Sequence, residues 1–246
     1  MYAAFLRSWL LAAALAGVLG GGCVTSGAPR PGETAADARV RHLPLIERPV
    51  RDPRGNLLAV MITGDGGWGL LDRHLAHGLA GYGIPDVGLS SLRYFWTKRT
   101  PDEASRDLAC ILRHYLAAWH KEKAILIGYS FGADVLPYMA SRLPEDLRHH
   151  VALVAILGPS TQATFEFKLS DWLTGGKRSE GYPTKPEVKR LKGMNVICVY
   201  GKREKDSLCP QLDPGDAKLI ETPGSHHFDH DYKNLTYIIV RESGAL

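Results

Sequence analysis

Ala124-Ile125-Leu126-Ile127-Gly128-Tyr129-Ser130-Phe131-Gly132, residues 124–132, joins a short apolar run to a Gly-x-Ser-x-Gly motif. A continuous apolar run of this length is typical of a strand in a parallel sheet that is covered on both faces. A helical pattern follows directly, over residues 132–142. A serine in a sharp strand-to-helix turn has an exposed hydroxyl, and the flanking glycines let neighbouring backbone approach. The stretch therefore predicts Ser130 as a nucleophile. The alternative is a turn serine that only caps the helix.

The rest of the chain alternates apolar runs with helical patterns. This order predicts βαβ units and an α/β fold with a right-handed, mostly parallel sheet. The helix at 101–119 has the clearest start, because Thr100, Pro101 and Glu103 form a capping box with proline in the first turn. The other expected strands are 57–63, 86–91, 151–157, 196–200 and 218–221, and the other expected helices are 69–81 and 230–241.

A serine nucleophile needs a histidine base and an acid that orients it, and in hydrolases of this topology the chain order is Ser, Asp or Glu, His. Two loops after late strands supply both groups. The first loop carries Glu204 and Asp206, of which we favour Asp206 because Asp is the commoner triad member. The second carries His226 and His227; we favour His226, since its Gly-x-His-x-Phe pattern resembles the histidine loop of esterases and thioesterases.

The oxyanion of an acyl-transfer reaction needs two backbone N–H donors. We expect one from Phe131, which follows the nucleophile, and the other from Gly66 or Gly67 in the glycine-rich stretch Gly64-Asp65-Gly66-Gly67-Trp68. A tight glycine turn without a catalytic part is the alternative for that stretch. The candidate substrate-binding residues are Asp65, Trp68 and Tyr129.

Length and composition limit the number of domains and exclude some classes of function. A chain of 246 residues is long enough for one domain with a sizeable core, which we place at 42–246, after a small, polar and flexible tether at 24–41. The formal net charge of +4 is too small for a dedicated nucleic-acid binder. No CxxC or HExxH motif occurs, so we expect no metal, and nothing points to an organic cofactor.

The first 23 residues have the pattern of a secretory signal: Arg7, an apolar core at 9–19, and the glycines 20–22 before Cys23. This end resembles the lipobox of bacterial lipoproteins, although Leu19 stands four residues before the cysteine instead of three. We therefore expect export to the periplasm, lipidation of Cys23 and attachment to a membrane surface. Cleavage by an ordinary signal peptidase, leaving a periplasmic protein without an anchor, is the alternative.

Export to an oxidising compartment favours disulfides. Cys198 and Cys209 lie eleven residues apart around a loop and are expected to pair. Cys110 falls on an apolar helix face and is expected to be a buried free thiol.

Five stretches of the sequence carry a further resemblance: Gly64–Trp68, Gly128–Pro137, Phe165–Phe167, Tyr200–Cys209 and Gly224–Asp229. Together they resemble the VirJ/AcvB family of exported bacterial virulence proteins. The resemblance covers about 57–241 and implies a periplasmic α/β-hydrolase that cleaves aminoacylated phosphatidylglycerol, chiefly the lysyl form. Longer members of that family have an extra N-terminal domain, which we do not expect in this chain.

The residues are compatible with this substrate, because Asp65 or Asp134 can face a lysyl ammonium group. The excursion at 160–192 is expected to form a lid, whose aromatic and basic side chains can rest on anionic lipid. Tyr94-Phe95-Trp96 is either part of the pocket wall or core. Two functional classes remain open: a serine hydrolase, with a general carboxylesterase or thioesterase as the second choice within it, and a periplasmic binding or assembly factor without catalysis.

Overall fold

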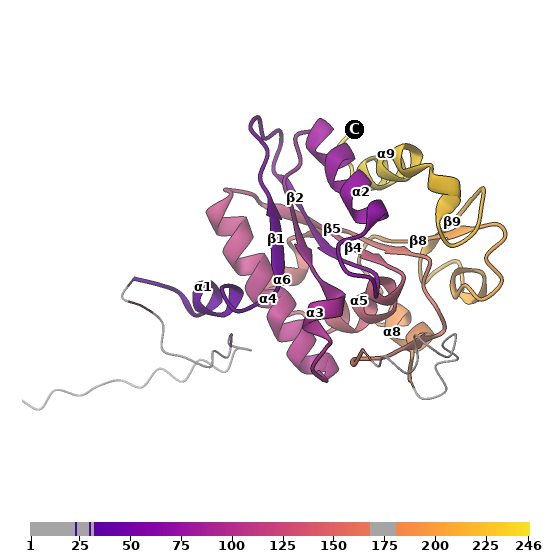
Figure 1. Ribbon diagram of the computed structural model, residues 1–246, viewed down its shortest axis with the longest axis horizontal. Coiled ribbons are helices and arrows are strands. Elements are labelled where there is room, and N and C mark those ends of the chain that lie inside the picture. The colour runs from indigo at the N-terminus through magenta and orange to yellow at the C-terminus, as the bar shows by residue number, and fades with distance from the viewer. Residues whose placement is uncertain (1–22, 24–29, 31, 168–180) are drawn as a thin grey trace, which may run out of the picture.

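The fold is built on a seven-stranded sheet with helices on both faces (Figure 1). It is seen in a computed structural model that describes residues 23, 30, 32–167 and 181–246. The strand order is β1-β3-β2-β4-β5-β8-β9, and only the edge strand β1 is antiparallel to its neighbour. The strands are β1 Leu45–Arg48, β2 Leu57–Ile62, β3 Asp86–Leu89, β4 Lys123–Tyr129, β5 Val151–Leu157, β8 Val196–Gly201 and β9 Lys218–Thr222.

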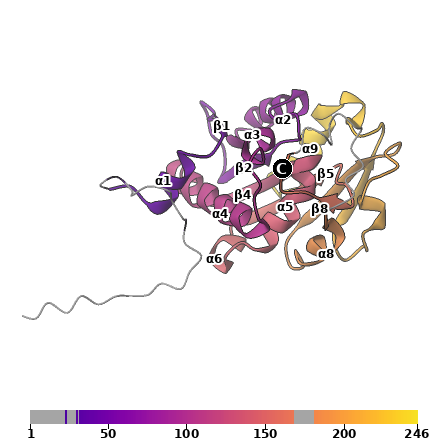
Figure 2. The ribbon, with the colours of Figure 1, turned by 60° about the horizontal axis from the view of Figure 1, so that its bottom comes forward.

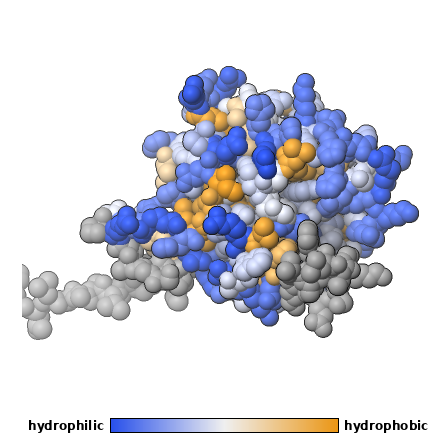
Figure 3. All heavy atoms as spheres, viewed as in Figure 1, coloured by the Kyte–Doolittle hydropathy of each residue, from blue (hydrophilic) through white to orange (hydrophobic). Residues whose placement is uncertain are grey.

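Two apolar clusters cover the two faces of the sheet. Helices α2 and α9 pack together on one face, whereas α4, α5 and α8 cover the other, with α1 against α4 (Figures 1 and 2). Between the apolar patches, the surface seen in Figure 3 is largely hydrophilic. The helices are α1 Ala35–Val40, α2 Leu70–Gly81, α3 Ser91–Tyr94, α4 Pro101–Ala118, α5 Phe131–Ser141, α6 Glu145–Arg148, α8 Thr184–Lys189 and α9 Tyr232–Glu242.

The α/β fold and the six expected strands are confirmed, with small shifts at their ends. The strand expected at 86–91 ends at Leu89, because Ser91 begins α3 and its N–H and Oγ both donate to Thr63. Strand β1 was not predicted, since its four residues are only partly buried and show no clear alternation. A two-stranded ribbon, β6 Gln162–Ala163 with β7 Tyr182–Pro183, lies in the excursion expected to be a lid.

The prediction of a flexible tether at 24–41 is wrong for the second half of that segment, which forms helix α1. Thr34 caps α1 and Asp37 completes the capping box. Arg39 then forms two hydrogen bonds of 2.6 and 2.7 Å with the buried Asp107 carboxylate of α4, which also accepts the Tyr94 hydroxyl proton. The helix therefore belongs to the folded domain, because it satisfies a carboxylate that would otherwise be buried without a cation.

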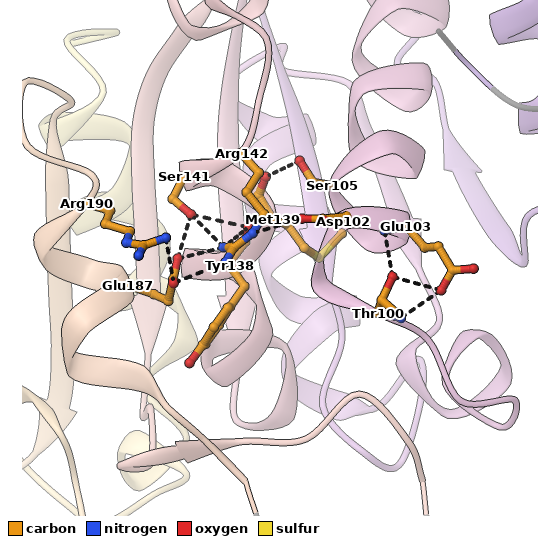
Figure 4. A network of polar contacts seen from close by, with 10 residues as sticks. All are labelled: Thr100, Asp102, Glu103, Ser105, Tyr138, Met139, Ser141, Arg142, Glu187 and Arg190. Carbon is orange, nitrogen blue, oxygen red and sulfur yellow. Dashed lines mark hydrogen bonds and ion pairs between the residues drawn. The ribbon is translucent and has the colours of Figure 1, made fainter. Parts of the chain in front are cut away.

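A network of polar contacts connects α5, the helix that follows Ser130, to α4 and α8 (Figure 4). Arg142, at the end of α5, lies 2.7 Å from the buried Glu187 of α8 and 3.1 Å from Asp102 of α4. Ser141 donates to the same Glu187 carboxylate, and Ser105 of α4 donates to a backbone carbonyl of α5. These contacts fix the position of α5, whose first residue follows Ser130.

No helix within the described ranges is both long and apolar enough to cross a membrane.

Candidate active site

Ser130 occupies a strained turn between β4 and α5. Its backbone has φ 53° and ψ −116°, in the left-handed region that a residue with a Cβ rarely adopts. The two motif glycines make this turn possible. A Cβ at Gly128 would lie 2.5 Å from the Gly132 carbonyl oxygen, and a Cβ at Gly132 would lie 2.1 Å from the Ile62 carbonyl oxygen. The local geometry is that of a nucleophile elbow.

His226 pairs with Glu204. Its Nδ1 atom lies 2.5 Å from Glu204 Oε1, on the loops that follow β9 and β8. Gly158, at the end of β5, has a left-handed φ of 61°, and a Cβ there would lie 3.0 Å from the His226 ring and 3.2 Å from Oε1. The absence of a side chain at this glycine leaves room for the pair.

The expectation that Asp206 would partner the histidine is wrong. Directly after β8 the chain turns tightly, with the Glu204 N–H donating to the Gly201 carbonyl at 2.8 Å. This turn brings Glu204 back over the end of the strand, towards His226, and leaves Asp206 on the exposed rim. The preference for His226 over His227 agrees with the geometry, since His226 is the one that contacts the carboxylate.

A cavity of about 700 Å³ brings the candidate residues together. Among the described residues that line this cavity, Pro159 is the only apolar one larger than glycine. The same residues include the carboxylates of Asp134, Glu204 and Asp206 and one lysine, Lys205. The buried Asp134 accepts the Ser160 N–H at 2.6 Å, which ties α5 to the loop after β5. The lining residues are Ser130, Asp134, Gly158, Pro159, Ser160, Thr161, Gln162, Glu204, Lys205, Asp206 and His226.

The loop 158–162 forms much of this wall. Its residues 160–162 belong to the segment 160–192 that was expected to be a lid, whereas Gly158 and Pro159 were not predicted to line the site. The sequence contained a feature that could have identified this loop: it follows the carboxyl end of the predicted strand 151–157, and parallel sheets bind ligands at that end.

The glycine-rich stretch after β2 lies beside Ser130, since a Cβ on Gly64 would be 3.7 Å from Ser130 Cβ. The Gly67 N–H donates to the Gly64 carbonyl at 3.1 Å, so it closes the turn itself and is not aimed at an oxyanion. The expectation for Gly67 is therefore wrong, and Gly66 remains the candidate from this loop. Phe131 is the first residue of α5, where N–H groups point out of the helix.

The three candidate substrate-binding residues lie outside the cavity wall. Trp68 packs on the sheet: a Cβ on Gly88 of β3 would lie only 2.2 Å from Trp68 Cζ3. The expected role of Trp68 in binding is thus not supported. Asp65 is partly exposed at the tip of the glycine turn. Tyr129 stacks on His226, with ring centroids 5.3 Å apart.

In the aromatic run after β3, Tyr94 and Phe95 are buried in the core, whereas Trp96 is exposed and stacks on Phe167. The part of the expected lid at 168–180, with Trp172, Lys177 and Arg178, lies outside the described residues. Among the residues that the structure describes, no group of three or more His, Cys, Asp or Glu could hold a metal ion.

The pairing of Cys198 with Cys209 is confirmed. The expectations for the other two cysteines are wrong, since Cys23 and Cys110 form a second disulfide. Cys110 is therefore not a free thiol, and the Cys23 sulfur is not available for a thioether to lipid. The tertiary structure agrees with this pairing, because α1 packs on α4, the helix that carries Cys110.

Residues 56–245 match a family described as bacterial virulence protein (VirJ). The chain belongs to the VirJ family. A comparison with curated proteins finds no match. Among solved structures, this VirJ chain is similar in fold to several α/β-hydrolases.

Est1E from Butyrivibrio proteoclasticus, with ferulic acid bound, has a TM-score of 0.59 and 13% identity, over 83% of this chain and 96% of its own. The Pyrococcus furiosus esterase Pf2001 has a TM-score of 0.56 and 13% identity, over 81% and 90%. An alpha-beta serine hydrolase homologue from Coxiella burnetii has a TM-score of 0.55 and 16% identity, over 80% and 89%. Because the identities are this low, the comparisons show the α/β-hydrolase fold alone.

Proposed function

We propose that this VirJ chain is a serine hydrolase that uses Ser130, His226 and Glu204 to cleave an ester. The observation that carries the proposal is the strained Ser130 in the same cavity wall as the hydrogen-bonded pair of His226 and Glu204. A carboxylate that accepts from Nδ1–H leaves Nε2 free to take a proton, which is the arrangement a base needs.

In the proposed reaction, Ser130 Oγ attacks the ester carbonyl while His226 Nε2 takes the hydroxyl proton. The N–H groups of Phe131 and Gly66 stabilise the oxyanion of the tetrahedral intermediate. As this collapses, the carbon–oxygen bond breaks and His226 returns the proton to the departing alcohol. Water then attacks the acyl-enzyme with His226 again as base, releasing the acid and restoring Ser130.

We further propose an aminoacyl ester as the substrate, with lysyl-phosphatidylglycerol as the form that the family resemblance implies. The residues that line the cavity support a polar, cationic acyl group, because Asp134 and Asp206 contribute negative charge and, among the described residues, Pro159 is the only apolar side chain in the lining. A general carboxylesterase or thioesterase for fatty acyl chains would need an apolar wall.

The two disulfides support a periplasmic location, because such bonds persist in oxidising compartments. The apolar segment at 9–19 after Arg7 supports export to that compartment. Contact with the membrane would then come through the lipid substrate.

The test is release of lysine from lysyl-phosphatidylglycerol in mixed micelles, measured by mass spectrometry, for the wild-type protein and Ser130→Ala. A fluorophosphonate probe followed by peptide mapping reports the nucleophile independently. We expect labelling at Ser130 and loss of lysine release in the variant. Equal release by Ser130→Ala would refute the mechanism. Labelling at Ser130 together with faster cleavage of neutral butyrate esters than of lysyl-phosphatidylglycerol would favour a general carboxylesterase. A folded protein with neither labelling nor release would point to a binding factor.

A further inference from the structure

Tyr129, the residue before the nucleophile, lies where three loops meet. Its ring is close to the glycine turn after β2, since a Cβ on Gly64 would be 3.4 Å from Tyr129 Cδ1. On the other side the ring stacks on His226, with planes 29° apart. The side chain thus touches both the candidate oxyanion loop and the candidate base while lying outside the cavity wall.

The hydroxyl of Tyr129 also contacts the residue that follows His226. It lies 2.9 Å from His227 Nδ1 and 3.4 Å from the His226 backbone carbonyl. One hydroxyl thereby reaches the two consecutive histidines of the loop after β9. Tyr129 is the last residue of β4, so its backbone is fixed by the sheet and its side chain serves as a rigid reference for this loop.

The histidine loop has an unusual backbone that needs such support. Phe228, Asp229 and His230 have consecutive left-handed φ angles of 54°, 47° and 61°. A left-handed conformation costs free energy at a residue with a Cβ, so other contacts must hold the loop in place. Phe228 is buried, and Asp229 Oδ1 lies 2.6 Å from an Arg203 guanidinium nitrogen on the neighbouring loop.

The surroundings of Tyr129 and His227 favour the uncharged form of both groups. Burial raises the pKa of the Tyr129 phenol, with Tyr232, Asp72, Glu204 and Asp65 adding to the effect. Burial also lowers the pKa of His227, helped by the nearby His226 and His230 and opposed by Glu204. These shifts favour the neutral phenol and the neutral imidazole, so the contact is a hydrogen bond between two uncharged groups.

We propose that Tyr129 is a positioning residue: its ring and its hydrogen bond to His227 hold the His226 imidazole against Glu204. This inference rests on the proposed hydrolase. It assigns a role to the motif position between Gly128 and Ser130, and it gives His227 a function distinct from that of a second base. Neither Tyr129 nor His227 needs to touch the substrate.

The test compares Tyr129→Phe, His227→Ala and their double variant on a small soluble ester. Tyr129→Phe keeps the ring and removes only the hydroxyl. We expect each single variant to lower kcat about 3- to 10-fold with KM unchanged, as the loss of one neutral hydrogen bond implies. Because both remove the same bond, the double variant should fall no further than either single one. Tyr200→Phe is the matched control, since in the described part of the chain the Tyr200 hydroxyl hydrogen-bonds to an exposed carboxylate, Glu221. The kcat of this control should stay at the wild-type value.

A spectroscopic measurement separates positioning from general loosening. The low-field proton NMR signal of the His226 Nδ1–H should broaden or disappear in Tyr129→Phe and His227→Ala, while the melting temperature stays near that of Tyr200→Phe. Wild-type kcat in both single variants, or losses that multiply in the double variant, would overturn the inference while leaving the hydrolase intact. Absence of Ser130 labelling in the wild-type protein would instead remove the proposed function, and this inference with it.

Discussion

Glu204 Oε1 lies 2.5 Å from His226 Nδ1, although the two residues belong to loops that follow different strands. Strands β8 and β9 are adjacent and parallel, so their carboxyl ends bring the two loops together. A Cβ at Gly201 would lie 2.3 Å from the Ser225 carbonyl oxygen, which shows how closely the loops pack. The close packing of these two loops, more than any feature of the loop sequence, places Glu204 and not Asp206 against the histidine.

The choice of acid can be tested directly with Glu204→Gln and Asp206→Asn. We expect Glu204→Gln to lower kcat by about 10²- to 10⁴-fold, because the amide no longer holds the correct histidine tautomer. Asp206→Asn should keep kcat within about threefold of wild type on a neutral soluble ester, because the rim residue does not contact His226. The reverse ranking in steady-state kinetics would restore Asp206 as the acid.

Asp134 should distinguish charged from neutral substrates. Asp134→Asn keeps an oxygen that can accept the Ser160 N–H and removes the negative charge. For a lysyl ester we therefore expect a KM about 5- to 20-fold higher, and for a neutral ester of similar size little change. Equal effects on both esters, measured side by side, would mean that Asp134 acts on the structure of the cavity alone.

The Cys198–Cys209 disulfide closes the loop that carries Glu204. Replacing both cysteines by alanine should lower the free energy of unfolding by about 2–3 kcal/mol, the effect expected for a loop of this length. Activity should fall as well, because the acid loop gains freedom. Urea unfolding and kcat measured on the double variant check both effects; unchanged values would show that the turn after β8 holds the loop without the bond.

The Cys23–Cys110 disulfide predicts a specific peptide. Digestion without reducing agent should yield a cross-linked fragment joining residue 23 to α4, and reduction should separate it. Mass spectrometry of protein purified from the periplasm is the measurement. A diacylglyceryl group on Cys23, with Cys110 reactive to alkylating agents, would contradict the pairing.

Asp86 should make stability depend on pH. It is fully buried at the start of β3, and among the described residues neither carboxylate oxygen has a hydrogen-bond partner. Burial raises the pKa of Asp86 to about 7 from 3.8. The unfolded chain ionises first, so the stability contributed by the protonated group is complete below pH 3.8 and is lost as the pH rises through 7.

Asp86→Asn should therefore raise the free energy of unfolding at pH 8, and the difference from wild type should shrink towards pH 5. The exposed Asp52→Asn is the matched control and should change stability little at either pH. Chemical unfolding at the two pH values measures the difference. A variant with the wild-type pH profile would show that Asp86 finds a partner in solution.

The sequence alone determined the fold class and the nucleophile elbow. Strands of a buried parallel sheet have continuous apolar sequences, and the Gly-x-Ser-x-Gly spacing is required by the geometry of a single turn. Both features can therefore be predicted from residues that are neighbours in the sequence. The same holds for the capping box at Thr100 and for the paired cysteines 198 and 209, which are close along the chain.

Contacts between distant segments were decided only by the tertiary structure. Whether Glu204 or Asp206 faces His226 depends on a turn packed against another loop, and the Cys23–Cys110 bond spans 87 residues. Trp68 lies on the sheet because Gly88 of a neighbouring strand leaves space for its ring. A local pattern encodes the conformation of its own segment, whereas partners brought together by the sheet depend on the register and packing of the whole chain.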